Sequence, residues 1–93
     1  GAAGAPPAAA DPACWFVPAN GTKHISYAGV YGHVHDLAWP AGTATPTWTD
    51  LTLSALAPPA AAERVTGWVE PGSATCRVAF RGTDGHLHEI RWG

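Results

Sequence analysis

The sequence predicts an all-β fold built from two copies of one unit. Residues 24–39 (HISYAGVYGHVHDLAW) match residues 77–92 (RVAFRGTDGHLHEIRW) at an offset of 53, with five of sixteen positions identical and six conservative. The letters APPAAA also occur twice, starting at Ala5 and again at Ala57. Two matches in the same order at nearly the same spacing indicate a duplication. We therefore expect a first repeat over residues 1–53 and a second over residues 54–93.

Short runs of alternating or apolar residues, separated by turn residues, predict the strands of each repeat. In the first repeat the predicted strands cover residues 14–18, 23–28, 33–39 and 47–53. In the second repeat they cover residues 66–70, 76–81 and 86–92, and the sequence ends at Gly93 without a counterpart of the fourth strand. The second unit is therefore predicted to be incomplete.

Turn chemistry supports each connection between these strands. The first two strands of each repeat are joined by Ala19-Asn20-Gly21 or by Pro71-Gly72-Ser73, which are residues that favour turns. The next connections, residues 29–32 and 82–85, begin and end with glycine, which supplies the positive φ of tight hairpins. No window predicts a helix, because Pro58 and Pro59 interrupt the alanine-rich segment 54–63, which we expect to be an extended connector.

Four short strands in a repeat of about 50 residues are typical of the blades of a β-propeller. A blade is apolar on both faces because it packs between neighbours, and two blades cannot close a ring. We therefore expect the chain to oligomerise head to tail into a closed ring, with a trimer of six blades favoured, or to belong to a longer array.

Composition excludes several classes of function. The net charge is -2 and only 13% of the residues are charged, so there is no basic surface for nucleic acid. No apolar run approaches the length needed for membrane insertion, and the first residues lack the features of a signal peptide. Methionine is absent, which favours a processed product or a piece of a longer protein.

The cysteines and histidines offer weak signals for metal binding. Cys14 and Cys76 permit one disulfide, typical of an oxidising compartment, but we favour two unpaired strand cysteines. His33 with His35, and His86 with His88, could each chelate one ion, since residues two apart share a strand face. Each pair lacks further ligands nearby, so we favour packing roles and predict no metal and no cofactor.

No pattern of residues predicts catalysis, so we expect the chain not to be an enzyme. There is no G-x-S-x-G motif and no phosphate-binding glycine loop. Asp36 and Glu89 occupy equivalent positions in separate repeats, which argues against an acid and base pair of a glycosidase.

A carbohydrate site is the strongest functional hypothesis. Trp39 and Trp48 are predicted at one rim of the first repeat, and Arg77 and Glu89 at the same rim of the second. A bulged hairpin would make Arg77 and Glu89 cross-strand neighbours on one face. Indole faces stack on sugar rings, and a paired guanidinium and carboxylate bind vicinal hydroxyls. The alternative is an ordinary surface ion pair, with Trp15 and Trp68 assigned to packing.

The segment from Arg77 through Thr83-Asp84-Gly85 to Glu89 and Trp92 resembles the blade motif of the fucose-binding β-propeller lectins, and the similarity covers nearly the whole chain. In the small six-bladed members, three chains of two blades close the ring. The letters RGTDGHLHEIRW, WTDLT and APPAA are more similar still to PLL-like seven-bladed bacterial lectins.

The resemblance implies a secreted or extracellular lectin that binds L-fucose-like or O-methylated monosaccharides between blades. It implies that Arg77 and Glu89 bind the sugar and that Trp39 and Trp48 of a neighbouring blade stack on it. His24, Asp36 and Trp92 occupy the equivalent positions of the other site, where His24 replaces the arginine and Asp36 the glutamate. The alternatives are a structural or targeting fragment of a longer secreted protein, and a metal-binding repeat that uses the His-x-His pairs.

Overall fold

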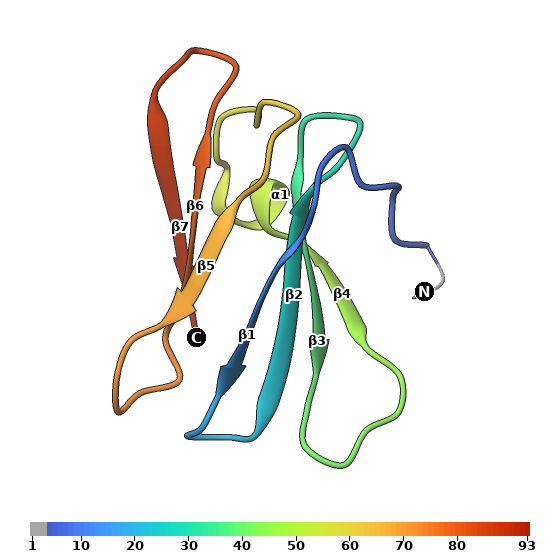
Figure 1. The fold of residues 1–93 in the computed structure, drawn as a ribbon, viewed down its shortest axis with the longest axis vertical. Coiled ribbons are helices and arrows are strands. Elements are labelled where there is room, and N and C mark those ends of the chain that lie inside the picture. The colour runs from blue at the N-terminus through green and yellow to red at the C-terminus, as the bar shows by residue number, and fades with distance from the viewer. Residues whose placement is uncertain (1–3) are drawn as a thin grey trace.

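The computed structural model describes residues 4–93 and shows an all-β protein with two antiparallel sheets (Figure 1). The first three residues of the predicted first repeat lie outside this range. The first sheet has the strand order β1 (Ala13–Val17), β2 (Thr22–Ala28), β3 (Val34–Trp39) and β4 (Thr47–Asp50). The second sheet has the order β5 (Thr66–Val69), β6 (Cys76–Arg81) and β7 (Leu87–Trp92). The predicted strands are confirmed to within a few residues at their ends.

The two sheets repeat each other in register as well as in order. Ala28 pairs with Val34 across the β2–β3 hairpin, and Arg81 pairs with Leu87 across the β6–β7 hairpin, 53 residues later. Both hairpins turn through a glycine with positive φ, Gly32 at 81° and Gly85 at 84°, a conformation that residues with side chains rarely adopt. The same residue types at the same offset therefore build the same turn twice.

The two APPAAA segments also make equivalent contacts. Ala8 forms an isolated bridge with Gly29 of the first sheet, and Ala60 forms one with Gly82 of the second. Their neighbours donate backbone hydrogen bonds to the same strand positions, as when Ala61 binds the carbonyl of Arg81. Each segment thus lies beside the end of β2 or β6 and pairs with it through the backbone.

The core lies between the two sheets, which pack face to face. The first sheet contributes the buried side chains of Ala28 and Val34, and the second contributes those of Val78, Phe80 and Ile90. Because side chains alternate along a strand, the alternate residues of both sheets point away from this core. Each sheet therefore has an inner face toward the other sheet and an outer face on the opposite side of the molecule.

One helix, α1 (Leu51–Ala55), corrects two expectations: the fourth predicted strand ends at Asp50 rather than at Leu53, and the connector begins as a helical turn. The carboxylate of Asp50 accepts the backbone N–H of Leu53 at 3.0 Å and caps the helix. Five residues are too few to show a helical period, so the sequence pattern did not reveal it. Within residues 4–93, no helix has the length and hydropathy of a membrane-spanning segment.

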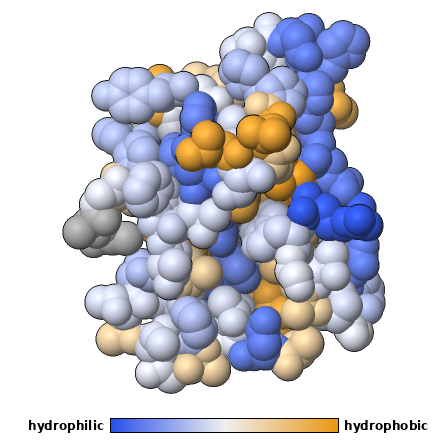
Figure 2. Space-filling view, turned by 180° about the vertical axis from the view of Figure 1, so that it is seen from behind, coloured by the Kyte–Doolittle hydropathy of each residue, from blue (hydrophilic) through white to orange (hydrophobic). Residues whose placement is uncertain are grey.

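The connections between the strands lie at two opposite ends of the molecule. The β1–β2 turn, the β3–β4 loop and the β5–β6 turn lie at one end, and the two glycine hairpins lie at the other (Figure 1). Seen from behind, the surface carries separate hydrophobic clusters rather than one continuous apolar face (Figure 2). The end that carries the β1–β2 and β5–β6 turns thus brings together strand ends from both sheets.

Candidate functional site

Arg77 is the centre of a charged cluster on the outer face of the second sheet. Its Nη1 donates to Glu89 at 2.5 Å, and its Nε and Nη2 both donate to Glu70, with the Nε contact at 2.7 Å. The register places Arg77 opposite Arg91, so Glu89, two residues earlier, is a diagonal neighbour on the same face. The carboxylates of Glu70 and then Glu89 raise the pKa of the Arg77 guanidinium, which stays charged. This trio carries a net charge of about -1 and remains open to solvent.

Glu70 is a site residue that the sequence interpretation missed. It lies just after β5 and reaches the Arg77 guanidinium from the neighbouring strand. The available signal was its spacing, because Glu70 is two residues after Trp68 at the end of a predicted strand and so shares the face of Arg77. Trp68 itself, predicted to be a packing residue, lies on this outer face with 37% of its surface exposed.

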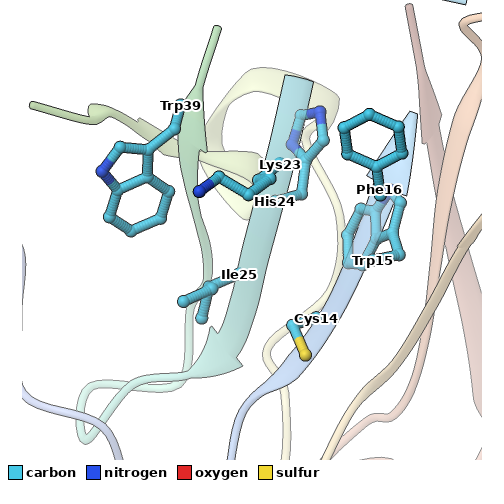
Figure 3. Close-up of a pocket in the computed structure, with 7 residues that line it drawn as sticks. All are labelled: Cys14, Trp15, Phe16, Lys23, His24, Ile25 and Trp39. Carbon is cyan, nitrogen blue, oxygen red and sulfur yellow. The ribbon is translucent and has the colours of Figure 1, made fainter. Parts of the chain in front are cut away.

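The aromatic half of the predicted site lies on the outer face of the first sheet. Trp39 ends β3 and is half-buried, while Trp48 in β4 is 39% exposed and pairs with Leu37 on the same face. Next to Trp39 is a hollow of about 440 Å³ (Figure 3). Its lining residues are mostly apolar and come from three adjacent strands: Cys14, Trp15, Phe16, Lys23, His24, Ile25 and Trp39.

Lys23 brings a positive charge to this hollow, and its side chain extends toward Trp39 (Figure 3). A flat indole beside an ammonium group on an otherwise apolar floor resembles a surface for a polar molecule with one apolar side. The sequence analysis did not single out Lys23. The available signal was strand alternation, because Lys23 is two residues before Ile25 and so lies on the same face of the sheet, where it pairs with Trp39.

Arg77 and Glu89 are therefore in contact, but the chain does not bring them to Trp39 and Trp48. The two pairs lie at the same end of the molecule, as predicted, because Trp39 ends β3 and Arg77 lies near the start of β6. They occupy opposite outer faces, since the two sheets pack through their inner faces. Only a second molecule can complete a site that uses all four.

The equivalent site of the first repeat is closed. His24 and Asp36 are 7% and 3% exposed, and the Asp36 carboxylate accepts hydrogen bonds from His24 Nδ1 and from the Ser26 hydroxyl, both at 2.8 Å. With both partners satisfied and the second sheet above them, these residues form a buried polar network. Against the expectation that His24 and Asp36 bind sugar, the structure leaves both side chains almost without exposed surface.

Aromatic packing explains why this site is closed. We call the contact between the inner faces of the two sheets the inner seam. Trp15 stacks on His24 with ring centroids 5.2 Å apart, and Trp92 meets both rings edge-on at 6.0 Å. Trp92, predicted to be a sugar-binding residue, is partly buried and packs against the core. The indole of Trp15 rests directly on Gly67, where any Cβ would collide with the ring. The Trp15 indole thus fills the space between the two sheets at Gly67.

Cys76 lies in the same seam and is inert by its surroundings. Its sulfur accepts from Trp15 Nε1 at 3.5 Å and is 3.7 Å from His24 Nε2. Burial raises the pKa of the thiol, and the nearby Asp36 acts in the same direction, so the thiol stays protonated. Although cysteine, histidine and aspartate are aligned, solvent does not reach the sulfur. Cys14 is exposed on the outer face, and the two cysteines are unpaired.

In the first His-x-His pair the Nδ1 atoms already have protein partners, whereas the buried Nε2 of His35 has none. His33 Nδ1 binds the Asp50 carboxylate at 2.7 Å, and His35 Nδ1 accepts from Trp48 Nε1 at 3.1 Å. Burial lowers the pKa of His35, which is 2% exposed and stays neutral. In the second pair, His88 Nε2 contacts the Asp84 carboxylate at 3.0 Å. Over residues 4–93, no three His, Cys, Asp or Glu side chains form a group suited to a metal ion.

Comparison of the chain with models of protein families, with curated proteins and with solved structures finds no match.

Proposed function

We propose that this protein is a carbohydrate-binding lectin whose two sheets are blades of a β-propeller, closed into a ring by further copies, with a trimer favoured. In this arrangement the outer face of the second sheet meets the outer face of the first sheet of a neighbour. Arg77 and Glu89 then lie opposite Trp39 and Trp48 of that neighbour, and the sugar binds in the seam between them.

The observation that carries the proposal is the Arg77 cluster. A guanidinium held by two carboxylates is fixed in orientation while leaving free N–H groups and carboxylate lone pairs toward solvent. That donor and acceptor pattern suits the vicinal hydroxyls of a monosaccharide. The opposing indoles supply the apolar plate that a fucose-like or O-methylated sugar requires. Each site is expected to be weak, with avidity coming from the several sites of a ring.

Glycan-array binding tests the proposal, with fucosylated and O-methylated glycans as the principal probes. We expect wild-type protein to bind these glycans and the variants Arg77→Ala and Glu89→Ala to lose at least tenfold in apparent affinity. Arg81→Ala is the matched control, because Arg81 forms a similar ion pair with Glu63 on the same face but nearer the hairpin end. Absence of glycan binding, or equal loss in all three variants, would contradict a sugar site at Arg77. A ring that assembles without binding glycans would favour the structural alternative.

A further inference from the structure

The inner seam shows how two copies of the chain could pack against each other. We call the contact between the outer face of the second sheet and the outer face of the first sheet of another copy the outer seam. At the offset of 53 residues, the outer face of the second sheet corresponds to the inner face of the first, and the outer face of the first corresponds to the inner face of the second. Trp68 thus corresponds to Trp15, and Arg77 to His24. The two outer faces therefore correspond to the two inner faces, which already pack against each other within the chain.

The exposed fractions of equivalent residues show that the outer face of the second sheet lacks a covering layer. Val34 is 0% exposed because the second sheet and α1 cover the inner face, whereas its equivalent, Leu87, is 82% exposed. Val17, also 0% exposed, corresponds to Glu70 in the Arg77 cluster. The second sheet therefore presents on its outer face an exposed leucine and an ion cluster at positions that are covered in the first sheet.

The duplication favours a second copy of this chain as the molecule that covers it, because the outer face of the first sheet corresponds to the inner face of the second sheet. Cys76, which contacts His24 in the inner seam, corresponds to Lys23 on the outer face of the first sheet. In a seam with the same register, Lys23 of one copy reaches the Arg77 cluster of the next. There the Lys23 ammonium can pair with the carboxylate of Glu70 or of Glu89, and Arg91, which lies opposite Arg77 on the same face, brings a second guanidinium close by.

The outer seam differs from the inner one at the point of closest approach. Inside the chain, the Trp15 indole rests on Gly67, which has no side chain. In the outer seam the equivalent pair is Trp68 over Cys14, and the next pair places Phe16 where the inner seam has Val69. Both outer residues are larger than their counterparts, so the sheets cannot approach as closely there.

We infer that two copies of this chain dock in the register of the inner seam and that Cys14 and Phe16 hold the outer seam open, which makes the groove for the ligand. The hollow beside Trp39, lined by both residues, is the first-sheet half of this groove. The register follows from the geometry alone, whereas the identity of the ligand rests on the proposed function. Gly67 in one seam and Cys14 in the other thus decide which seam is closed and which is open.

Cross-linking of the full chain tests the register. In the variant Trp68→Cys, a short bismaleimide should join the new thiol at position 68 of one copy to Cys14 of the next, giving a ladder of trimers and larger species or a closed covalent ring. Cys76 is buried and should not react. Thr83→Cys, which places the thiol on a hairpin at the other end of the molecule, is the matched control and should give no such ladder. Products limited to dimers, or ladders of equal yield in both variants, would overturn the register.

Replacing Cys14 tests whether it opens the groove. We expect Cys14→Gly to keep the assembled mass in sedimentation and to bind methyl α-L-fucoside at least tenfold more weakly, because the seam closes on Trp68. Cys14→Ser keeps the bulk and should behave as wild type in both measurements. If Cys14→Gly binds the fucoside within twofold of wild type, Cys14 does not hold the groove open. If the ladder forms but wild type does not bind the fucoside, the register stands and the lectin proposal fails. Fucoside binding without a ladder supports the lectin proposal and overturns the register.

Discussion

The equivalent residues of the two repeats have opposite surroundings, and Asp36 and Glu89 illustrate this most clearly. Asp36 is buried and accepts hydrogen bonds from two side chains of its own sheet, while the Glu89 side chain is 41% exposed and contacts Arg77. A buried carboxylate with two donors is a structural group, because its loss leaves those donors unpaired. An exposed ion pair contributes little to stability and is free to bind a ligand.

This contrast leads to a prediction about stability. Asp36→Ala should lower the free energy of unfolding by about 3 kcal/mol, because His24 and Ser26 lose their buried partner. Glu89→Ala, the equivalent change in the second repeat, should alter it only slightly in dilute protein. Urea denaturation followed by tryptophan fluorescence measures both. Equal destabilisation by the two changes would show that the two sites are alike, against the structure.

At the scale of elements, α1 depends on the residue that caps it. The Asp50 carboxylate caps the helix at Leu53 and also binds His33, and α1 in turn supports β3, since Val34 N–H donates to the Thr52 hydroxyl at 2.8 Å. Burial acts to raise the pKa of Asp50, but the hydrogen bonds from the Leu53 amide and from His33 outweigh it, so the pKa is lowered from its usual 3.8. The folded state therefore favours the ionised carboxylate.

The lowered pKa of Asp50 fixes the sign of its effect on stability. The stabilising contribution is complete above about pH 4 and is lost as the pH falls through the lower pKa of the folded state. Asp50→Ala should cost about 1 kcal/mol near neutral pH, the usual value of a helix cap. It should also show a smaller further loss of stability than wild type between about pH 5 and pH 3. Urea melts at these pH values measure both, and parallel pH profiles would rule out this role for Asp50.

At the scale of the molecule, two stacked sheets cover only half of their four faces. Leu87 is the clearest consequence, since its equivalent in the first repeat is fully buried. Part of the first sheet's outer face is already covered by the N-terminal segment, where the Tyr27 hydroxyl donates to the Pro6 carbonyl at 2.7 Å. The uncovered area is therefore concentrated at the end that carries Trp39 and at the second sheet.

A prediction about self-association follows from Leu87. Leu87→Asp should weaken association of the chains by tenfold or more, since a leucine that is buried on docking contributes about 1.5 to 3 kcal/mol. The far-UV circular dichroism spectrum should stay unchanged because Leu87 is outside the core. Val30→Asp, a change at an exposed valine of the other hairpin, is the control and should leave association intact. Sedimentation velocity measures both, and identical concentration dependence of the two variants would argue against docking at this face.

The sequence by itself determined the strands, their turns and their duplication. These are local properties: alternation needs only the neighbours along the chain, and Gly32 and Gly85 meet a backbone requirement within their own hairpins. The contact of Arg77 with Glu89 was expected from a bulged hairpin, but the hairpin has a regular register that places Arg77 opposite Arg91, and Glu89 reaches Arg77 as a diagonal neighbour. Helix α1 was not predicted, because a five-residue helix shows too little of its period.

The tertiary structure alone decided which of the two similar sites is closed. His24 and Arg77 occupy the same position in equivalent strands, and nothing in either strand says which face the other sheet will cover. That choice depends on how the two sheets stack, and the stacking depends on Gly67, which admits the Trp15 indole. Contacts between residues far apart in the chain thus assign burial to one repeat and exposure to the other, and so separate a structural pair from a candidate binding pair.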